Sequence, residues 1–236
     1  MQMYIGGFAK NTLIDFPGTV ACMVFTQGCN FHCPYCHNPE LVAGPRKAAG
    51  DLLDPEGILE FLEKRKGLLD GVAITGGEPC LQKDLAEFCS AVKNMGYKVK
   101  LDSNGSFPRV LEQLFDRELI DYLAMDIKTD PDAYTLAAPA SVRPRQIRQS
   151  IELVMERAPA YEFRTTCCRP FVSDEILDRI GKMISGASRY CLAKCSRNVK
   201  VLDSEFVKSD NHFFTDKEMT ALKSVIEPYV KEVILR

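Results

Sequence analysis

Residues 20–39 of the chain read VACMVFTQGCNFHCPYCHNP, and this stretch gives the strongest indication of the fold and the chemistry. Its first part, Val20–Thr26, is a continuous apolar run rich in strand-forming residues, which predicts a strand buried on both faces. The loop that follows places Cys29, Cys33 and Cys36 in a C-x3-C-x2-C pattern. Three thiolates so close together can hold a cubane iron–sulfur cluster by three of its corners, which leaves the fourth iron open to a substrate or cofactor.

Two other interpretations of the cysteine loop are open at this point. A structural zinc site would use the three cysteines together with His32 or His37 as a fourth ligand. Zinc sites usually pair two C-x2-C-like halves, and the sequence has no second half with that spacing. Three free thiols are the remaining alternative. The spacing favours an iron–sulfur cluster.

Strand-like and helix-like patterns alternate along the rest of the chain. Strands are predicted at 72–74, 97–101, 122–128, 161–168 and 230–236, and helices at about 108–117 and 144–157 and around 55–62, 81–92, 176–184 and 216–227. The alternation occurs about six times, which predicts an α/β fold whose parallel sheet curls into a full or partial barrel with the helices outside. We find no internal repeat or linker, so residues 1–236 are expected to form a single domain.

Polar turns follow three of the predicted strands. They are Gly76-Gly77-Glu78-Pro79, Asp102-Ser103-Asn104-Gly105 and Asp126-Ile127-Lys128. Because barrels of this class build their active sites at the carboxyl ends of the strands, we expect these turns and the cysteine loop to converge. Two adjacent glycines let a ligand approach the backbone closely, and Glu78 supplies a carboxylate for an ammonium group. Taken alone, the Gly-Gly-Glu-Pro stretch is also typical of an ordinary strand-to-helix turn.

The composition argues against several classes of function. The chain has 30 Lys and Arg against 32 Asp and Glu, a formal net charge of -2, which gives no general attraction to nucleic acid or acidic membranes. The amino terminus lacks a basic start and apolar run, and no stretch approaches the roughly 18 apolar residues of a membrane span. We therefore expect a soluble, cytoplasmic protein whose ten cysteines are thiols or metal ligands rather than disulfides.

The cysteine loop, with Tyr35 before its last cysteine, and the Gly-Gly-Glu turn resemble the radical S-adenosylmethionine superfamily. Three further stretches resemble the anaerobic ribonucleoside-triphosphate reductase activating proteins, relatives of the pyruvate formate-lyase activating enzyme: LIDFPG at 13–18, FTQGCNF at 25–31 and CHNPELV at 36–42. The resemblance continues through Asp102–Gly105, Asp126–Lys128 and Arg164–Thr166, and it thins after about residue 170. It implies a partial (β/α)6 barrel of the radical S-adenosylmethionine type, with a cluster loop at 27–38 and a C-terminal extension at about 200–236.

This resemblance implies that Cys29, Cys33 and Cys36 hold one 4Fe–4S cluster, whose open iron binds S-adenosylmethionine. Reductive cleavage would yield a 5′-deoxyadenosyl radical, which removes hydrogen from a glycine of a partner glycyl-radical enzyme. The implied cofactor contacts are Asn38, Gly76, Gly77, Glu78, Lys128 and Arg164, and Asp102, Ser103 and Asp126 match a monovalent-cation site. No cysteine lies between Cys36 and Gly71, so no ferredoxin-like insertion is present and flavodoxin or ferredoxin is the expected electron donor.

Two alternatives to a glycyl-radical activase belong to different classes. The first is a radical enzyme that acts on a small molecule, similar to carboxydeazaguanine synthase. The second is a cluster protein that only carries electrons, and the Gly-Gly-Glu and Asp-Ile-Lys motifs argue against it because an electron carrier needs no methionine pocket.

Four late cysteines depart from the family pattern. Cys167 and Cys168 stand where aliphatic strand residues are expected, and Cys191 and Cys195 stand where a polar and aromatic strand is expected. They form either a redox pair or second metal site, or simply small buried hydrophobic residues. Because their spacing does not provide a complete set of metal ligands, we favour the interpretation as small buried hydrophobic residues.

Overall fold

The computed structural model of the chain describes residues 1–44, 52–138 and 143–236. Within these residues one sheet of eight strands runs in chain order from β1 to β8. The strands are β1 (Ile5–Thr12), β2 (Ala21–Thr26), β3 (Gly71–Gly76), β4 (Lys98–Ser103), β5 (Tyr122–Asp126), β6 (Tyr161–Cys167), β7 (Tyr190–Lys194) and β8 (Val233–Leu235). β1 pairs with β2 in antiparallel fashion, and every later pair of neighbours is parallel. The predicted α/β architecture, a parallel sheet of partial-barrel type, is confirmed.

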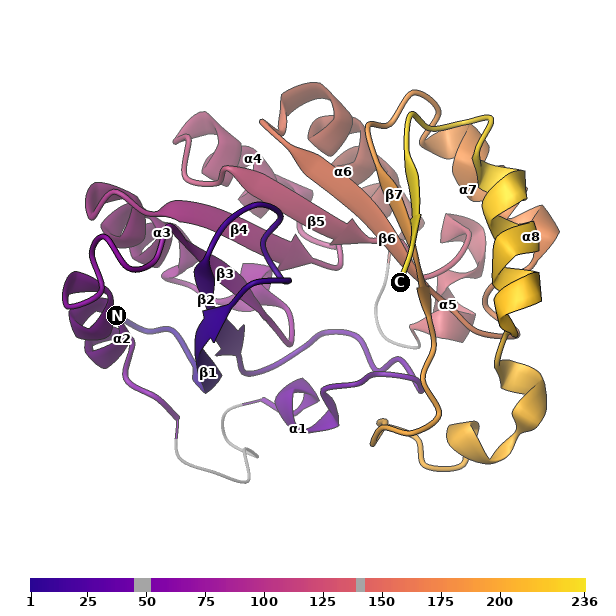
Figure 1. Cartoon of the computed structure of the whole chain (residues 1–236), viewed down its shortest axis with the longest axis horizontal. Coiled ribbons are helices and arrows are strands. Elements are labelled where there is room, and N and C mark those ends of the chain that lie inside the picture. Colours follow the sequence, from indigo (N-terminus) through magenta and orange to yellow (C-terminus); the bar gives the residue numbers. More distant parts are fainter. Residues whose placement is uncertain (45–51, 139–142) are drawn as a thin grey trace.

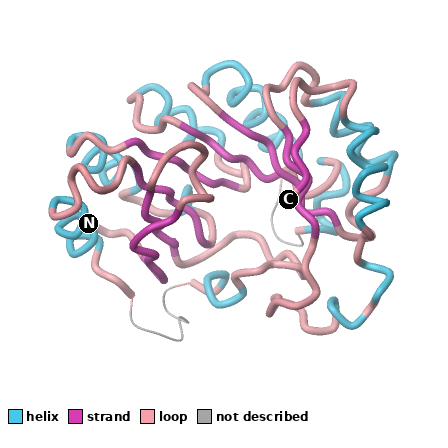
Figure 2. Tube along the Cα trace, viewed as in Figure 1, coloured by secondary structure: helices cyan, strands magenta, loops and turns pink. Residues whose placement is uncertain are grey.

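Helices connect the parallel strands and cover one side of the sheet. They are α1 (Pro39–Val42), α2 (Pro55–Glu63), α3 (Leu85–Asn94), α4 (Pro108–Asp116), α5 (Tyr134–Ala137), α6 (Pro144–Arg157), α7 (Asp174–Met183) and α8 (Asp216–Ile226). Figures 1 and 2 show the longer helices along the outer side of the curved sheet, while α1 and the loop before it cross the opposite side. Within the described ranges no helix combines the length and the apolar character needed to cross a membrane.

The buried strands follow from their apolar sequences. Val24 of β2, Val72 of β3, Leu101 of β4 and Leu123 of β5 lie on one face of the sheet and have no exposed surface, so the centre of that face is fully covered. The carboxyl ends of the same strands carry the polar turns. The fold therefore brings segments more than a hundred residues apart to one rim.

The helix signals in the sequence are largely confirmed. Asp54 caps α2 by accepting a hydrogen bond from the Glu56 backbone N–H, and Pro55 occupies the first turn. Thr215 and Glu218 form a complete capping box at the start of α8. The predicted helix at 144–157 is α6 with the same bounds.

Three local features differ from the predictions. β1 was not anticipated, and it adds an antiparallel strand to one edge of the sheet. The segment predicted as one helix from Leu81 begins with a single 3₁₀ turn, η2 (Pro79–Leu81), and α3 starts only at Leu85. Residues 230–236 contribute only the short strand β8. The 3₁₀ turn results from Glu78, whose carboxylate caps the Cys80 backbone N–H and tightens the chain there.

Candidate active site

A cavity of about 210 Å³ lies at the carboxyl ends of β3 to β6. Every predicted site residue lines it: Cys29, Cys33, Cys36, Asn38, Gly76, Gly77, Glu78, Asp102, Ser103, Asp126, Lys128 and Arg164. Its wall also includes Phe31, Tyr35, His37, Val42, Thr75, Asn104 and Thr166, which were not among the predicted site residues. The convergence of the four polar segments, expected from the barrel rule alone, is therefore present.

The cysteine loop leaves β2 and is held by backbone hydrogen bonds to the α1 region. The Gly28 N–H donates to Leu41 O at 2.8 Å, and the Cys29 N–H donates to Val42 O at 3.1 Å. Cys33 is buried, while Cys29 and Cys36 are half-buried. Burial raises the pKa of Cys29 to about 12 and that of Cys33 to about 11, so both carry protons that a bound metal would displace.

The three thiols are not arranged around a single point. Among residues 1–44, 52–138 and 143–236, no three Cys, His, Asp or Glu side chains converge closely enough to hold one metal ion. A cubane cluster does not need such convergence, because each thiolate binds a different iron.

Gly76 and Gly77 let the turn after β3 pack directly against the start of the cysteine loop. A Cβ atom on Gly77 would lie 2.1 Å from Gly28 O, and one on Gly76 would lie 2.4 Å from Thr26 N. Gly76 also has a φ of +113°, which side chains disfavour. Glu78 N–H donates to Gly28 O at 2.8 Å across this contact. The two glycines are therefore required for the close approach of two backbone segments.

The Glu78 carboxylate is buried and ties the turn after β3 to the end of β4. It accepts hydrogen bonds from the Cys80 N–H at 3.0 Å, from Ser103 Oγ at 2.9 Å and from the Asn104 N–H at 2.7 Å. Burial raises the pKa of Glu78, although these hydrogen bonds oppose the shift. Since a carboxylate offers about four acceptor positions, roughly one remains for a ligand in the cavity.

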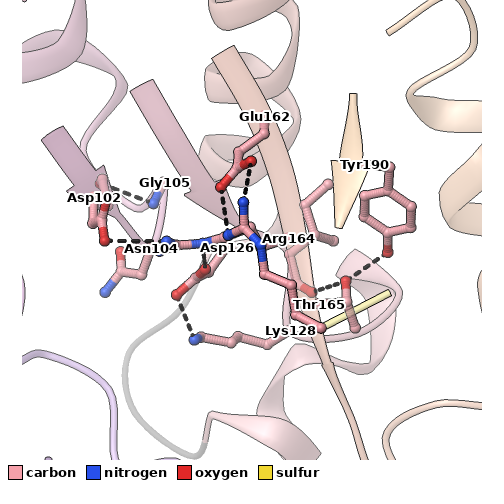
Figure 3. Close-up of polar contacts among 12 residues, drawn as sticks. Asp102, Asn104, Gly105, Asp126, Lys128, Glu162, Arg164, Thr165 and Tyr190 are labelled. Atoms are coloured by element: carbon pink, nitrogen blue, oxygen red, sulfur yellow. Dashed lines mark hydrogen bonds and ion pairs between the residues drawn. The ribbon is translucent and has the colours of Figure 1, made fainter. Parts of the chain in front are cut away.

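A row of alternating charges crosses the cavity wall from β4 to β6. Arg164 bridges two carboxylates, with Nη1 3.1 Å from Asp102 Oδ2 and Nε 2.8 Å from Asp126 Oδ1. Lys128 Nζ lies 2.9 Å from Asp126 Oδ2, and Lys100 forms an ion pair with Asp102. Figure 3 shows Asp102, Asp126, Lys128 and Arg164 pointing toward one another from neighbouring strands and the turn after β5. The row holds two cationic groups, Lys128 and Arg164, in fixed positions at the cavity.

These ion pairs favour the charged forms of Asp102, Asp126, Lys128 and Arg164. Burial alone would raise the pKa of Asp102 and Asp126, but the facing cations outweigh it and lower both. Burial alone would lower the pKa of Lys128 and Arg164, but the facing carboxylates outweigh it and raise both. Lys128 and Arg164 are thus suited to an anionic group such as a carboxylate.

The residues expected at a monovalent-cation site have other partners in the structure. Asp102 and Asp126 are paired with Arg164, and the Ser103 hydroxyl donates to Glu78. The three side chains line the same cavity. The cation site stays a prediction.

A polar network that the sequence analysis missed links the cysteine loop to the turn after β4. Asn104 Nδ2 donates to Asn30 Oδ1 at 2.9 Å, and Asn30 Nδ2 donates to Ser106 Oγ at 2.9 Å. Ser106 Oγ in turn donates to Asn104 Oδ1 at 2.6 Å. Nothing in the sequence could pair Asn30 with Asn104, because the pairing depends on how the strands are placed. The network fixes the middle of the cysteine loop against β4.

Tyr35, the aromatic residue of the cysteine loop, has a buried hydroxyl at the cavity. Its ring packs against Phe171 and Phe206 with centroid separations of 5.4 and 6.0 Å. Among the described residues the hydroxyl has no hydrogen-bond partner. A buried donor without a partner is unfavourable unless a ligand satisfies it, which indicates that this wall of the cavity is built for an occupant.

Comparison with known proteins identifies the family. The model of the Radical SAM superfamily matches residues 23–184. The chain belongs to this superfamily. Its members use a 4Fe–4S cluster and S-adenosylmethionine, and this chain is accordingly a radical S-adenosylmethionine enzyme, an oxidoreductase.

Among the relatives of this radical S-adenosylmethionine enzyme are two proteins named as activating enzymes. A protein of Methanocaldococcus jannaschii with the provisional name glycyl-radical enzyme activating enzyme is 29% identical over 241 residues, which cover 100% of this chain and 97% of that protein. The pyruvate formate-lyase-activating enzyme of Listeria monocytogenes is 39% identical over 127 residues, which cover 49% of each chain.

A solved structure supports the fold alone. The Streptococcus suis protein SuiB, crystallised with the precursor peptide SuiA, matches with a TM-score of 0.68 and 15% identity. The match covers 91% of this chain and 48% of the SuiB chain.

The cavity fits both cofactors of the superfamily. Its soft sulfur donors suit iron, and the fixed cations Lys128 and Arg164 suit the carboxylate of an amino-acid ligand. The Tyr35 hydroxyl offers a further donor to a bound molecule. The donor set and the charges therefore agree with the family.

Proposed function

We propose that this enzyme activates a glycyl-radical enzyme, and that its partner is an anaerobic ribonucleoside-triphosphate reductase. The observation that carries the proposal is one cavity that holds the three loop cysteines, the Gly76-Gly77 edge and the row of charges. Support for the activase class comes from the M. jannaschii relative, which is matched over almost its whole length. The reductase is proposed because the stretches at 13–18, 25–31 and 36–42 resemble the reductase activating proteins.

In this proposal Cys29, Cys33 and Cys36 hold the cluster. When bound, the reduced cluster cleaves S-adenosylmethionine to a carbon radical that abstracts hydrogen from a glycine of the partner. The Gly76-Gly77 backbone edge and the remaining acceptor of Glu78 bind the ammonium group of the cofactor. The Glu78 carboxylate is buried, which keeps bulk water from competing for it.

Four further residues complete the proposed binding site. Lys128 and Arg164 receive the cofactor carboxylate, since ion pairs to Asp126 and Asp102 hold both cations in place before binding. Asn38, directly before α1, is a further cofactor contact. Asp102 and Asp126 position the cations.

The electrons are proposed to come from an external protein such as flavodoxin or ferredoxin. The cavity holds one cysteine triad, which provides for one cluster. We also propose that residues 1–236 act as one domain, in which the segment from about residue 200 supports the cluster loop.

A radical-transfer experiment tests the proposal. Anaerobic, reduced, cluster-loaded enzyme is mixed with S-adenosylmethionine and with either anaerobic ribonucleotide reductase or pyruvate formate-lyase, and glycyl radicals are measured by electron paramagnetic resonance. A radical in the reductase is expected, and none should appear in a reductase whose radical glycine is replaced by alanine. A radical only in the lyase would reject the reductase as partner. Cofactor cleavage with a small molecule consumed and no protein radical would favour the small-molecule alternative and overturn the activase class.

A further inference from the structure

The residues that directly follow the adjacent strands β6 and β7 are both cysteines, Cys168 and Cys195. The last register pair of these parallel strands is Cys167 with Lys194, so Cys168 and Cys195 are the next residue on each chain. Cys168 has no exposed surface and Cys195 is 3% exposed. Neighbouring positions on paired strands lie about 5 Å apart, which is within the Cα separation that a disulfide spans.

The pKa values of the two thiols are shifted in opposite directions. The pKa of Cys195 is lowered, first by the neighbouring Cys168 side chain and then by His37 and His212, which together outweigh burial. The neighbouring Cys195 side chain and burial raise the pKa of Cys168. These shifts favour a thiolate on Cys195 and a thiol on Cys168, which is the arrangement of a reactive dithiol.

The pair is enclosed between the cavity and the C-terminal segment. His37, which helps to lower the pKa of Cys195, also lines the cavity. On the other side, Cys168 forms a β-bridge with Phe213. His212 stacks on Phe206 at 4.3 Å, and its Nδ1 lies 2.8 Å from Phe206 O. Neither Cys168 nor Cys195 lines the cavity itself, and their burial closes both sulfur atoms to protein-sized oxidants.

We propose that Cys168 and Cys195 are a peroxide-reactive dithiol that closes into a reversible disulfide. The Cys195 thiolate attacks hydrogen peroxide, an S–O bond forms as the O–O bond breaks, and one water leaves to give a sulfenic acid. The Cys168 sulfur then attacks the Cys195 sulfur, an S–S bond forms, and the second water leaves. Two thiols lose two electrons and two protons, and one peroxide becomes two waters. A dithiol reductant reverses the reaction.

Two other uses of these sulfur atoms have less support. Cys191 pairs in register with Arg164, three positions before Cys167, so Cys167 and Cys191 are not neighbours across the strands. A second metal site would need at least three converging ligands, and the described part of the chain has no such group. The register of β6 and β7 therefore favours Cys168 and Cys195 as the two cysteines that can form a disulfide.

Isotope-coded alkylation measures the disulfide without any reference to activity. Cluster-loaded enzyme is treated anaerobically with about one molar equivalent of hydrogen peroxide, alkylated under denaturing conditions, then reduced and alkylated with a heavy reagent. Mass spectrometry should find the heavy label on Cys168 and Cys195, and dithiothreitol added before the first alkylation should remove it. Cys191→Ala, which removes a buried cysteine of the same strand, should give the same labelling as wild type.

A pair of variants separates a chemical role from a structural one. In Cys168→Ser the attacking sulfur is lost, so dimedone should trap a sulfenic acid on Cys195. In Cys195→Ser no dimedone adduct should form on Cys168. Heavy label spread evenly over the cysteines of wild type, or confined to Cys29, Cys33 and Cys36, would overturn the proposal. Because labelling of wild type is decisive alone, the test stands even if a variant fails to fold. Its outcome does not depend on the partner or the radical chemistry.

Discussion

The part of the chain matched by the family model, residues 23–184, differs in role from the part that follows it. Residues of the cavity wall run from Cys29 to Thr166, and none of the residues 185–236, all of them described, lines the cavity. The later part nevertheless contacts the cysteine loop, since the Asp203 N–H donates to Pro34 O at 3.0 Å and Phe206 packs on Tyr35. The first region lines the cavity, and the later region packs against the loop that carries Cys29, Cys33 and Cys36.

The first way to test this division is to remove a proposed cluster ligand. In Cys33→Ala the cluster loses one of its three thiolates, so iron, sulfide and S-adenosylmethionine cleavage should all be lost. Iron and sulfide analysis and product chromatography measure the two effects. Cys191→Ala, a buried cysteine on β7, should retain both. A Cys33→Ala protein that still cleaved the cofactor would refute the ligand assignment.

The second test removes the central cation of the charge row. Arg164→Gln leaves Asp102 and Asp126 partly buried without the guanidinium, which should destabilise the fold by about 3–5 kcal/mol at pH 7. Urea unfolding measures the loss. Arg157→Gln, which breaks an exposed pair with Asp116, should change stability little.

The pH dependence of the same variant sharpens the second test. The folded protein lowers the pKa of Asp102 and Asp126, so the stabilisation is complete above the unfolded value of about 4 and is lost as pH falls through the folded values. The stability difference between wild type and Arg164→Gln should therefore shrink below about pH 4. A constant difference down to pH 2 would show that the variant acts through packing rather than charge.

The third test concerns the supporting region. Phe206 is buried against Tyr35, Phe171 and His212, so Phe206→Ala should cost about 3 kcal/mol and also weaken cluster retention. Thr215→Ala in the same region removes only the α8 capping box and should cost about 1 kcal/mol. Urea unfolding and iron content measure both variants. Equal iron loss in the two would mean that general stability, rather than contact with the loop, controls the cluster.

The sequence predicted the strands and helices of the barrel because their apolar patterns match their burial. Val72–Ile74 and Val20–Thr26 are short apolar runs that lie in β3 and β2, and α6 has the predicted bounds. The site residues were predictable as a group because the carboxyl ends of parallel strands share one rim. This grouping of the site residues could be predicted from the order of strands and helices along the chain.

Side-chain partners and the edge strand could not be predicted from the sequence. β1 contains Gly6, Gly7, Lys10 and Asn11, which are poor strand formers, and pairing with β2 decides its conformation. Which cation faces Asp102 depends on the stagger of β4, β5 and β6. The neighbouring positions of Cys168 and Cys195 likewise follow from the register of β6 and β7.

The glycine turn after β3 limits how this enzyme can evolve. Gly77 meets Gly28 through main-chain atoms alone, as does Gly76 with Thr26, so no exchange of side chains can adjust the spacing between these two segments. A substitution at Gly76 or Gly77 can be accommodated only if a backbone segment shifts. Adaptation to a new partner is therefore expected at positions where side chains, rather than main-chain atoms, make the contacts.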